Sequence, residues 1–76
     1  MIKKILLVDT IQKAKEFVDI AQKFSKDITV ERGKYVVDGK SLLGVLSLNL
    51  SLPIGVCISD SDEDISKELD KFSIWL

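Results

Sequence analysis

The tripeptide Gly39-Lys40-Ser41 is the part of the sequence whose residue types most suggest chemistry, because it matches the end of a nucleotide-binding phosphate loop. Such a loop has a glycine, four further residues, and then Gly-Lys-Ser or Gly-Lys-Thr. Here five residues separate Gly33 from Gly39, and those at 35–38 are typical of a strand. The chain is also too short for the parallel sheet that carries such a loop. The spacing therefore excludes a phosphate-binding loop.

Ser41 has a second interpretation, as a residue that begins a helix and can receive a phosphate. A serine at this position places its hydroxyl among unpaired backbone N–H groups at the positive end of a helix. A phosphate added there would be stabilised locally and would leave the helix intact. The alternative is a plain helix cap, which contributes about 1 kcal/mol to stability. From these residues alone, the plain cap is the simpler interpretation.

Other chemistry has little support in the sequence. The chain has no histidine, which removes the commonest general acid/base and the commonest metal ligand at neutral pH. The acidic residues at 60–64 lack a twelve-residue calcium loop with a central glycine, and capping of a helix explains them better. Cys57 has no basic neighbour in sequence, so we expect an inert packing residue. We predict no enzyme activity, no metal and no cofactor.

The composition indicates an ordinary folded domain. The 76 residues suffice for one domain, 1–76, with 46% hydrophobic and 30% charged residues. Eleven basic and twelve acidic residues give a net charge of -1, which argues against a nucleic-acid partner. The apolar run near the start is too short for a signal peptide core or a membrane span. We therefore expect a cytoplasmic protein without a membrane partner.

Hydrophobic periodicity predicts the first half of the fold. Ile2 to Val8 form a short β-branched apolar run, typical of a strand. Asp9 and Thr10 are both good helix N-caps, and Gln12 follows Asp9 at the spacing of a capping box. Apolar residues then recur every three or four positions, which predicts a helix that ends near Ser25. Strands at 28–31 and 35–37 follow, joined by a turn at 32–34.

The second half begins with the helix capped by Ser41. We expect this helix to run from Leu42 to Leu48 and to end at Asn49 in the left-handed conformation. A strand at 54–59 follows Pro53, an acidic loop occupies 60–62, and Ile65, Leu69 and Phe72 mark a last amphipathic helix. We expect the apolar tail at 74–76 to fold back on the core. The order β-α-β-β-α-β-α predicts an α+β open-faced sandwich with a four-stranded antiparallel sheet and three helices on one face.

The segment KSLLGVLSLNLSLPIGVCIS, residues 40–59, resembles HPr, the histidine-containing phosphocarrier of the bacterial sugar phosphotransferase system. It matches without a gap the family's pattern of Lys-Ser, two large apolar residues, Gly and alternating apolar positions. The upstream DITVERGKYVVDGKS and the helical FVDIAQKF are also similar to the family. The resemblance implies the same HPr-like fold.

The sequence departs from HPr at the position that carries the phosphate. The family bears it on a histidine at the start of the first helix, and that position falls on Thr10 here. The neighbouring family arginine and proline fall on Gln12 and Lys13, and the preceding loop is three or four residues shorter than usual. A phosphothreonine ester holds its phosphate firmly, whereas a phosphoimidazole donates it. We therefore expect that the phosphocarrier chemistry is lost.

The resemblance also implies a regulatory role for Ser41. In many relatives the matching serine is phosphorylated by HPr serine kinase with ATP, and the product binds a transcription regulator in catabolite repression. The leucines matching Leu42, Leu43 and Leu46 lie exposed in HPr and contact partners. We therefore expect a regulatory or adaptor protein with Lys40 and these leucines as its partner-binding residues, for the kinase and for a transcription regulator or a phosphotransferase-system enzyme.

Two questions remain open from the sequence. A two-turn helix cannot direct all of its apolar residues at one sheet, so at least two should be exposed as a small patch. Leu43 and Leu46 fit that patch and the core equally well. The alternative function is a constitutive HPr-fold interaction or structural module that is never phosphorylated.

Overall fold

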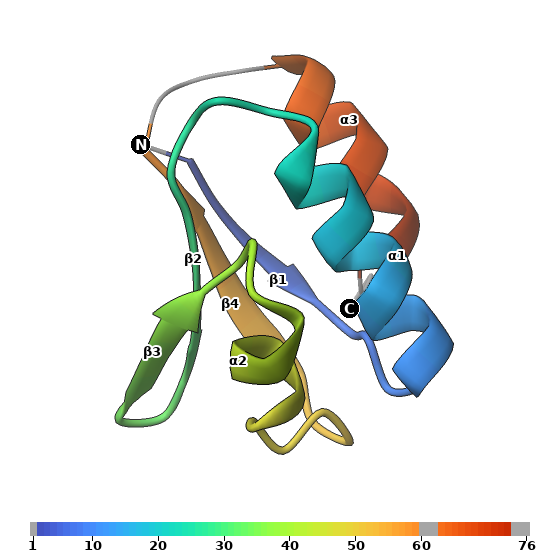
Figure 1. Cartoon of the computed structure of the whole chain (residues 1–76), viewed down its shortest axis with the longest axis vertical. Coiled ribbons are helices and arrows are strands. Elements are labelled where there is room, and N and C mark those ends of the chain that lie inside the picture. Colours follow the sequence, from blue (N-terminus) through green and yellow to red (C-terminus); the bar gives the residue numbers. More distant parts are fainter. Residues whose placement is uncertain (1, 60–62, 74–76) are drawn as a thin grey trace.

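Four antiparallel strands form one sheet (Figure 1). The computed structural model describes residues 2–59 and 63–73, with the side chain of Glu63 excepted. The strands are β1 (Ile2–Leu6), β2 (Ile28–Arg32), β3 (Tyr35–Asp38) and β4 (Ile54–Ile58). Their order across the sheet is β1-β4-β2-β3, so the last strand of the chain lies between the first and second. The predicted order of elements is confirmed.

Three helices cover one face of this sheet and leave the other open (Figure 1). They are α1 (Ile11–Gln22), α2 (Leu42–Leu46) and α3 (Glu63–Leu69), and a 3-10 turn, η1 (Asp70–Phe72), continues α3. Helices α1 and α3 run alongside one another, while the shorter α2 lies nearer the β2–β3 hairpin. The predicted α+β open-faced sandwich is therefore the observed fold.

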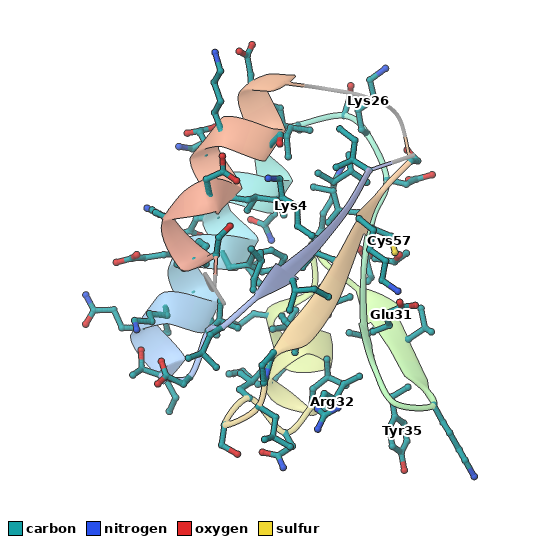
Figure 2. All side chains as sticks on the ribbon, turned by 180° about the vertical axis from the view of Figure 1, so that it is seen from behind. Lys4, Lys26, Glu31, Arg32, Tyr35 and Cys57 are labelled. Carbon is teal, nitrogen blue, oxygen red and sulfur yellow. The ribbon has the colours of Figure 1, made fainter. Side chains whose placement is uncertain are left out.

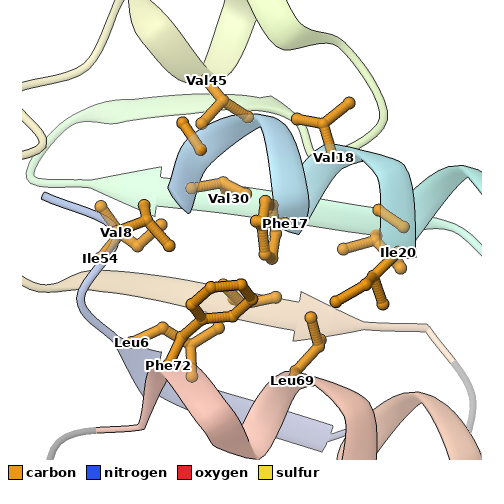
Figure 3. Packing of buried hydrophobic residues seen from close by; sticks show 14 of the residues in the cluster. Leu6, Val8, Phe17, Val18, Ile20, Val30, Val45, Ile54, Leu69 and Phe72 are labelled. Carbon is orange, nitrogen blue, oxygen red and sulfur yellow. The ribbon is translucent and has the colours of Figure 1, made fainter. Parts of the chain in front are cut away.

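The core fills the space between the sheet and the helices (Figure 3). Alternate strand residues such as Val30 and Val56 are fully buried because side chains in a strand point to opposite faces in turn. The rings of Phe17 from α1 and Phe72 from η1 meet edge to face, with their centroids 6.3 Å apart. The backbone N–H of Leu7 donates to the carbonyl of Phe72 at 2.9 Å, which ties the last helix to β1.

Helix α1 begins after Thr10, one of the two predicted caps, but it ends earlier than predicted. Thr10 is the N-cap, and its hydroxyl accepts a hydrogen bond from the N–H of Lys13 at 3.0 Å. Asp9 instead pairs with the Lys13 ammonium at 3.1 Å, so the capping box of Asp9 with Gln12 was wrong. The helix ends at Gln22, three residues before the expected Ser25, because the next backbone N–H groups turn back to carbonyls three residues earlier.

Helix α2 is also shorter than predicted. It ends at Leu46, and Ser47 is the C-cap, with its N–H bonded to the carbonyls of Leu43 and Gly44. No non-glycine residue in 2–59 or 63–73 has a positive φ, so the left-handed Asn49 was wrong. Asn49 ends the segment through its side chain instead, because its Oδ1 accepts from the N–H and hydroxyl of Ser51 at 3.2 and 2.6 Å.

The open face of the sheet carries an ion pair. Lys3 of β1, opposite Cys57, and Glu31 of β2, opposite Gly55, reach toward each other across β4, and their charged groups are 2.5 Å apart. The hydrogen bond and charge of Glu31 raise the pKa of Lys3 above its ordinary value. The side chain of Cys57, directly across from Lys3, is half-buried. Its inertness stays a prediction.

Two predicted features lie outside the described residues, the acidic loop at 60–62 and the apolar tail at 74–76. Within 2–59 and 63–73, no helix has the length and apolar character needed to cross a membrane.

Gly39 gives a direct test of how tightly the start of the α2 segment packs on β2. A Cβ at this position would lie 2.7 Å from the Ile28 Cγ2 and 3.0 Å from the Ile28 carbonyl oxygen. We predict that Gly39→Ala lowers the free energy of unfolding by about 1–3 kcal/mol, since backbone must move to make room. Urea denaturation measures the loss.

The matched control is Gly55→Ala. There the added Cβ meets side-chain atoms of Glu31 and Lys3 at 3.1–3.3 Å, and these flexible chains can shift. The loss should be smaller than at Gly39. An equal or larger loss at Gly55 would contradict the packing described.

Candidate functional site

Backbone hydrogen bonds hold the segment Gly39–Ser41 between β3 and α2. The N–H of Gly39 donates to the carbonyl of Ile28 at 2.8 Å. Asp38 then accepts twice, its Oδ1 from the N–H of Lys40 at 2.9 Å and its carbonyl from the N–H of Ser41 at 3.1 Å. The three residues form a tight, fully bonded turn, so Ser41 has a fixed position.

Lys40 is anchored to the end of α1. Its ammonium donates to the carbonyl of Phe24 at 2.5 Å, and its own carbonyl accepts from the Gln22 side chain at 2.9 Å. A cation near a helix C-terminus complements the partial negative charge there. Sequence reasoning missed the contacts of Gln22 and Phe24 with Lys40, because nothing in their spacing links α1 to residue 40.

Ser41 is the N-cap of α2, as predicted. Its backbone is extended and its hydroxyl oxygen accepts from the N–H of Gly44 at 3.2 Å. Gly44 allows this closeness, since a Cβ there would lie 3.3 Å from the Ser41 oxygen. The residue is half-buried, and within 2–59 and 63–73 its hydroxyl donates to no acceptor. Among these residues its oxygen therefore serves only as the acceptor of the helix cap.

The large apolar residues that follow Ser41 fall into three groups according to how exposed they are. Leu43 is 83% exposed. Leu42 and Leu46 are half-buried and pack against the core, while Val45 and Leu48 are buried. The expectation of at least two exposed apolar residues on this helix was therefore wrong. The five-residue helix sits with one side toward α1 and β3, which draws Leu42 and Leu46 partly inward.

Thr10 lies just before α1 and is the N-cap of that helix. The residue is exposed, and its hydroxyl is already an acceptor in the helix cap. Over the described part of the chain, no three His, Cys, Asp or Glu side chains lie close enough to hold a metal ion. The site therefore consists of Ser41 and the exposed surface beside it.

Comparison with known protein families identifies the family of this chain. A family model described as "PTS HPr component phosphorylation site" matches residues 11–74, which is most of the chain. The chain belongs to the HPr family. The match begins at Ile11, so that the family histidine position falls on Thr10 stays a prediction. No curated protein matched significantly.

Solved HPr structures have the same architecture. A structure titled HPr-C-His from Thermoanaerobacter tengcongensis is 26% identical with a TM-score of 0.80, and covers 93% of this chain and 89% of its own. The phosphocarrier protein HPr from Bacillus anthracis is 25% identical with a TM-score of 0.72, with 96% of each chain covered. HPr is a phosphocarrier and not an enzyme, and it works with enzymes of the phosphotransferase system. This chain is an HPr-like protein of that system without a histidine.

The cap at Ser41 can be tested by stability. Ser41→Ala removes the acceptor for the Gly44 N–H, and we expect the free energy of unfolding to fall by about 1 kcal/mol. Ser41→Asp keeps an acceptor at the cap and should retain most of the stability. Thermal and urea denaturation measure both, and an alanine variant as stable as the parent would show that the cap contributes nothing.

Proposed function

We propose that this protein is a regulatory or adaptor member of the HPr family, switched by phosphorylation at Ser41 and recognised by a protein partner. The observation that supports it best is the position of Ser41, a half-buried helix cap whose hydroxyl has no acceptor among the described residues. It lies two residues before the exposed Leu43, in a phosphocarrier family member without histidine. The chain cannot form phosphohistidine, so a phosphate signal has to use another residue. A hydroxyl ester suits a stable mark rather than a relay.

The surroundings of Ser41 favour modification without unfolding. A phosphate on its oxygen would lie at the N-cap of α2, near the N–H of Gly44 that the hydroxyl already accepts from. The preceding turn is held by the bonds of Asp38, and Lys40 is fixed to the end of α1. In this proposal Lys40 holds the segment Gly39–Ser41 in place for the kinase and does not itself contact the protein that recognises phosphorylated Ser41.

Recognition of the modified form would combine charge with an apolar contact. Leu43 projects from the first turn of α2 and is the most exposed of the helix's apolar residues. Leu42 and Leu46 add partly exposed surface beside it. The partners proposed are HPr serine kinase, which uses ATP in the cytoplasm, and as reader a transcription regulator or an enzyme of the phosphotransferase system.

Incubation with HPr serine kinase and ATP tests the modification. We expect mass spectrometry to find one phosphate, located on Ser41 by peptide fragmentation. Ser41→Ala should take up none, while Ser47→Ala should be phosphorylated like the parent, since Ser47 is an exposed serine at the other end of the same helix. Absence of phosphate, under conditions that label an ordinary HPr, would overturn the switch and leave the constitutive interaction module.

Leu43→Ser tests the reader surface. Because Leu43 is exposed, we expect the variant to keep the parent's stability and phosphorylation but to lose affinity for the reader by about tenfold. Leu52→Ser, an exposed leucine outside α2, is the control and should bind as the parent does. Calorimetry with the phosphorylated proteins and a catabolite-repression regulator compares the affinities. Equal binding by both variants would remove Leu43 from the interface.

A further inference from the structure

A hollow of about 600 Å³ lies at the turn end of the β2–β3 hairpin, beyond the C-terminal end of α2. Its hairpin side is formed by Arg32, Lys34 and Tyr35, and its helix side by Ser47, Leu48 and Asn49. Figure 2 shows Arg32 and Tyr35 together near the end of the hairpin. The hollow lies at the opposite end of α2 from Ser41, so it is separate from the phosphorylation site proposed above.

The lining carries positive charge and no acid. Arg32 and Lys34 contribute two cations, and neither belongs to an ion pair within 2–59 and 63–73. The neighbouring Glu31 does not offset them there, because it points to the open face of the sheet and pairs with Lys3. The charges of the hollow are therefore uncompensated by the described part of the chain.

Arg32 lacks an acceptor that it needs. Its Nε is buried yet has no hydrogen-bond partner in the described structure. A buried donor without an acceptor is destabilising. Because the chain itself covers Nε, an anion in the hollow would contact Arg32 through its two terminal nitrogens, which can hold an oxyanion bidentately.

Uncharged residues beside Arg32 and Lys34 add hydrogen-bond donors and apolar surface to the hollow. The side-chain oxygen of Asn49 accepts hydrogen bonds from Ser51, so the side-chain N–H groups of Asn49 are left to donate into the surroundings. The Tyr35 side chain is 71% exposed beside the hollow, and Leu48 is a buried apolar residue of its lining. The hollow thus combines donors for an oxyanion with apolar surface for a small ring.

We propose that this hollow binds a small organic phosphate monoester, with the phosphate on Arg32, Lys34 and Asn49 and the organic group beside Tyr35 and Leu48. Three terminal oxygens match this set of donors better than the two of a carboxylate. The volume is within the range of small-molecule sites. The proposal does not depend on phosphorylation of Ser41.

Phenyl phosphate is a suitable probe, followed by ¹H–¹⁵N NMR titration of the unphosphorylated protein. We expect shifts concentrated in the amides of residues 32–35 and 47–49 and in the side-chain amide signals of Asn49. Inorganic phosphate and benzoate should each bind more weakly, since the first lacks the ring and the second has two acceptor oxygens. Shifts scattered over all basic residues, or centred on residues 41–44, would overturn the proposal.

Variants test which cations hold the phosphate. Arg32→Lys keeps the charge but loses the fork, and Lys34→Gln removes a charge from an exposed side chain without affecting the core. Each should weaken phenyl phosphate binding by about tenfold. Lys15→Gln is the control, because it removes the same charge from the exposed surface of α1 and should bind as the parent does. Equal affinity in all three variants would overturn the proposal.

Discussion

The structure depends on the place of β4 between β1 and β2. This last strand joins the start of the chain to its middle, and its buried residues Ile54, Val56 and Ile58 form the floor on which the helices pack. Because these contacts are far apart in sequence, β4 can complete the sheet only after most of the chain has come together. Strand β3, at the far edge of the sheet, pairs with β2 only, and α2 lies against it. Both proposed sites, at Ser41 and at the hollow beside Arg32, lie where the well-packed core meets this less covered edge of the sheet.

The local sequence pattern was sufficient to predict the helices and strands, because each of them had a strong and simple signal. The apolar spacing of Ala14, Phe17, Val18 and Ala21 could serve only a helix with one buried face, and Pro53 marked the start of β4. The limits of the helices could not be read in this way. Asp9 and Thr10 cap equally well by type, and only the path of the chain out of β1 decides that the threonine does so. Asn49 likewise has two ways of ending a helix, and propensity does not choose between them.

The sequence was sufficient to predict the position of the candidate site along the chain, but not the burial and contacts of its residues. Ser41 as a cap follows from its type and place. How far each leucine of α2 is buried depends on the angle at which five residues lie against α1 and β3, which no short-range pattern encodes. The attachment of Lys40 to the end of α1 joins residues 16 positions apart, and the hollow at Arg32 joins a turn to a helix end. Such features arise from tertiary structure alone.

The threonine at the start of α1 links the helix cap to the chemistry that we expect this chain to have lost. We expect the family's phosphate-bearing histidine position to fall on Thr10, whose hydroxyl closes the helix beside the pair of Asp9 and Lys13. Restoring histidine would sacrifice that cap, at a cost of about 1 kcal/mol, before any chemistry was regained. A histidine at residue 10 would therefore have to act from a helix end without its cap. It would lie beside Gln12 and Lys13, where the family resemblance implies an arginine and a proline.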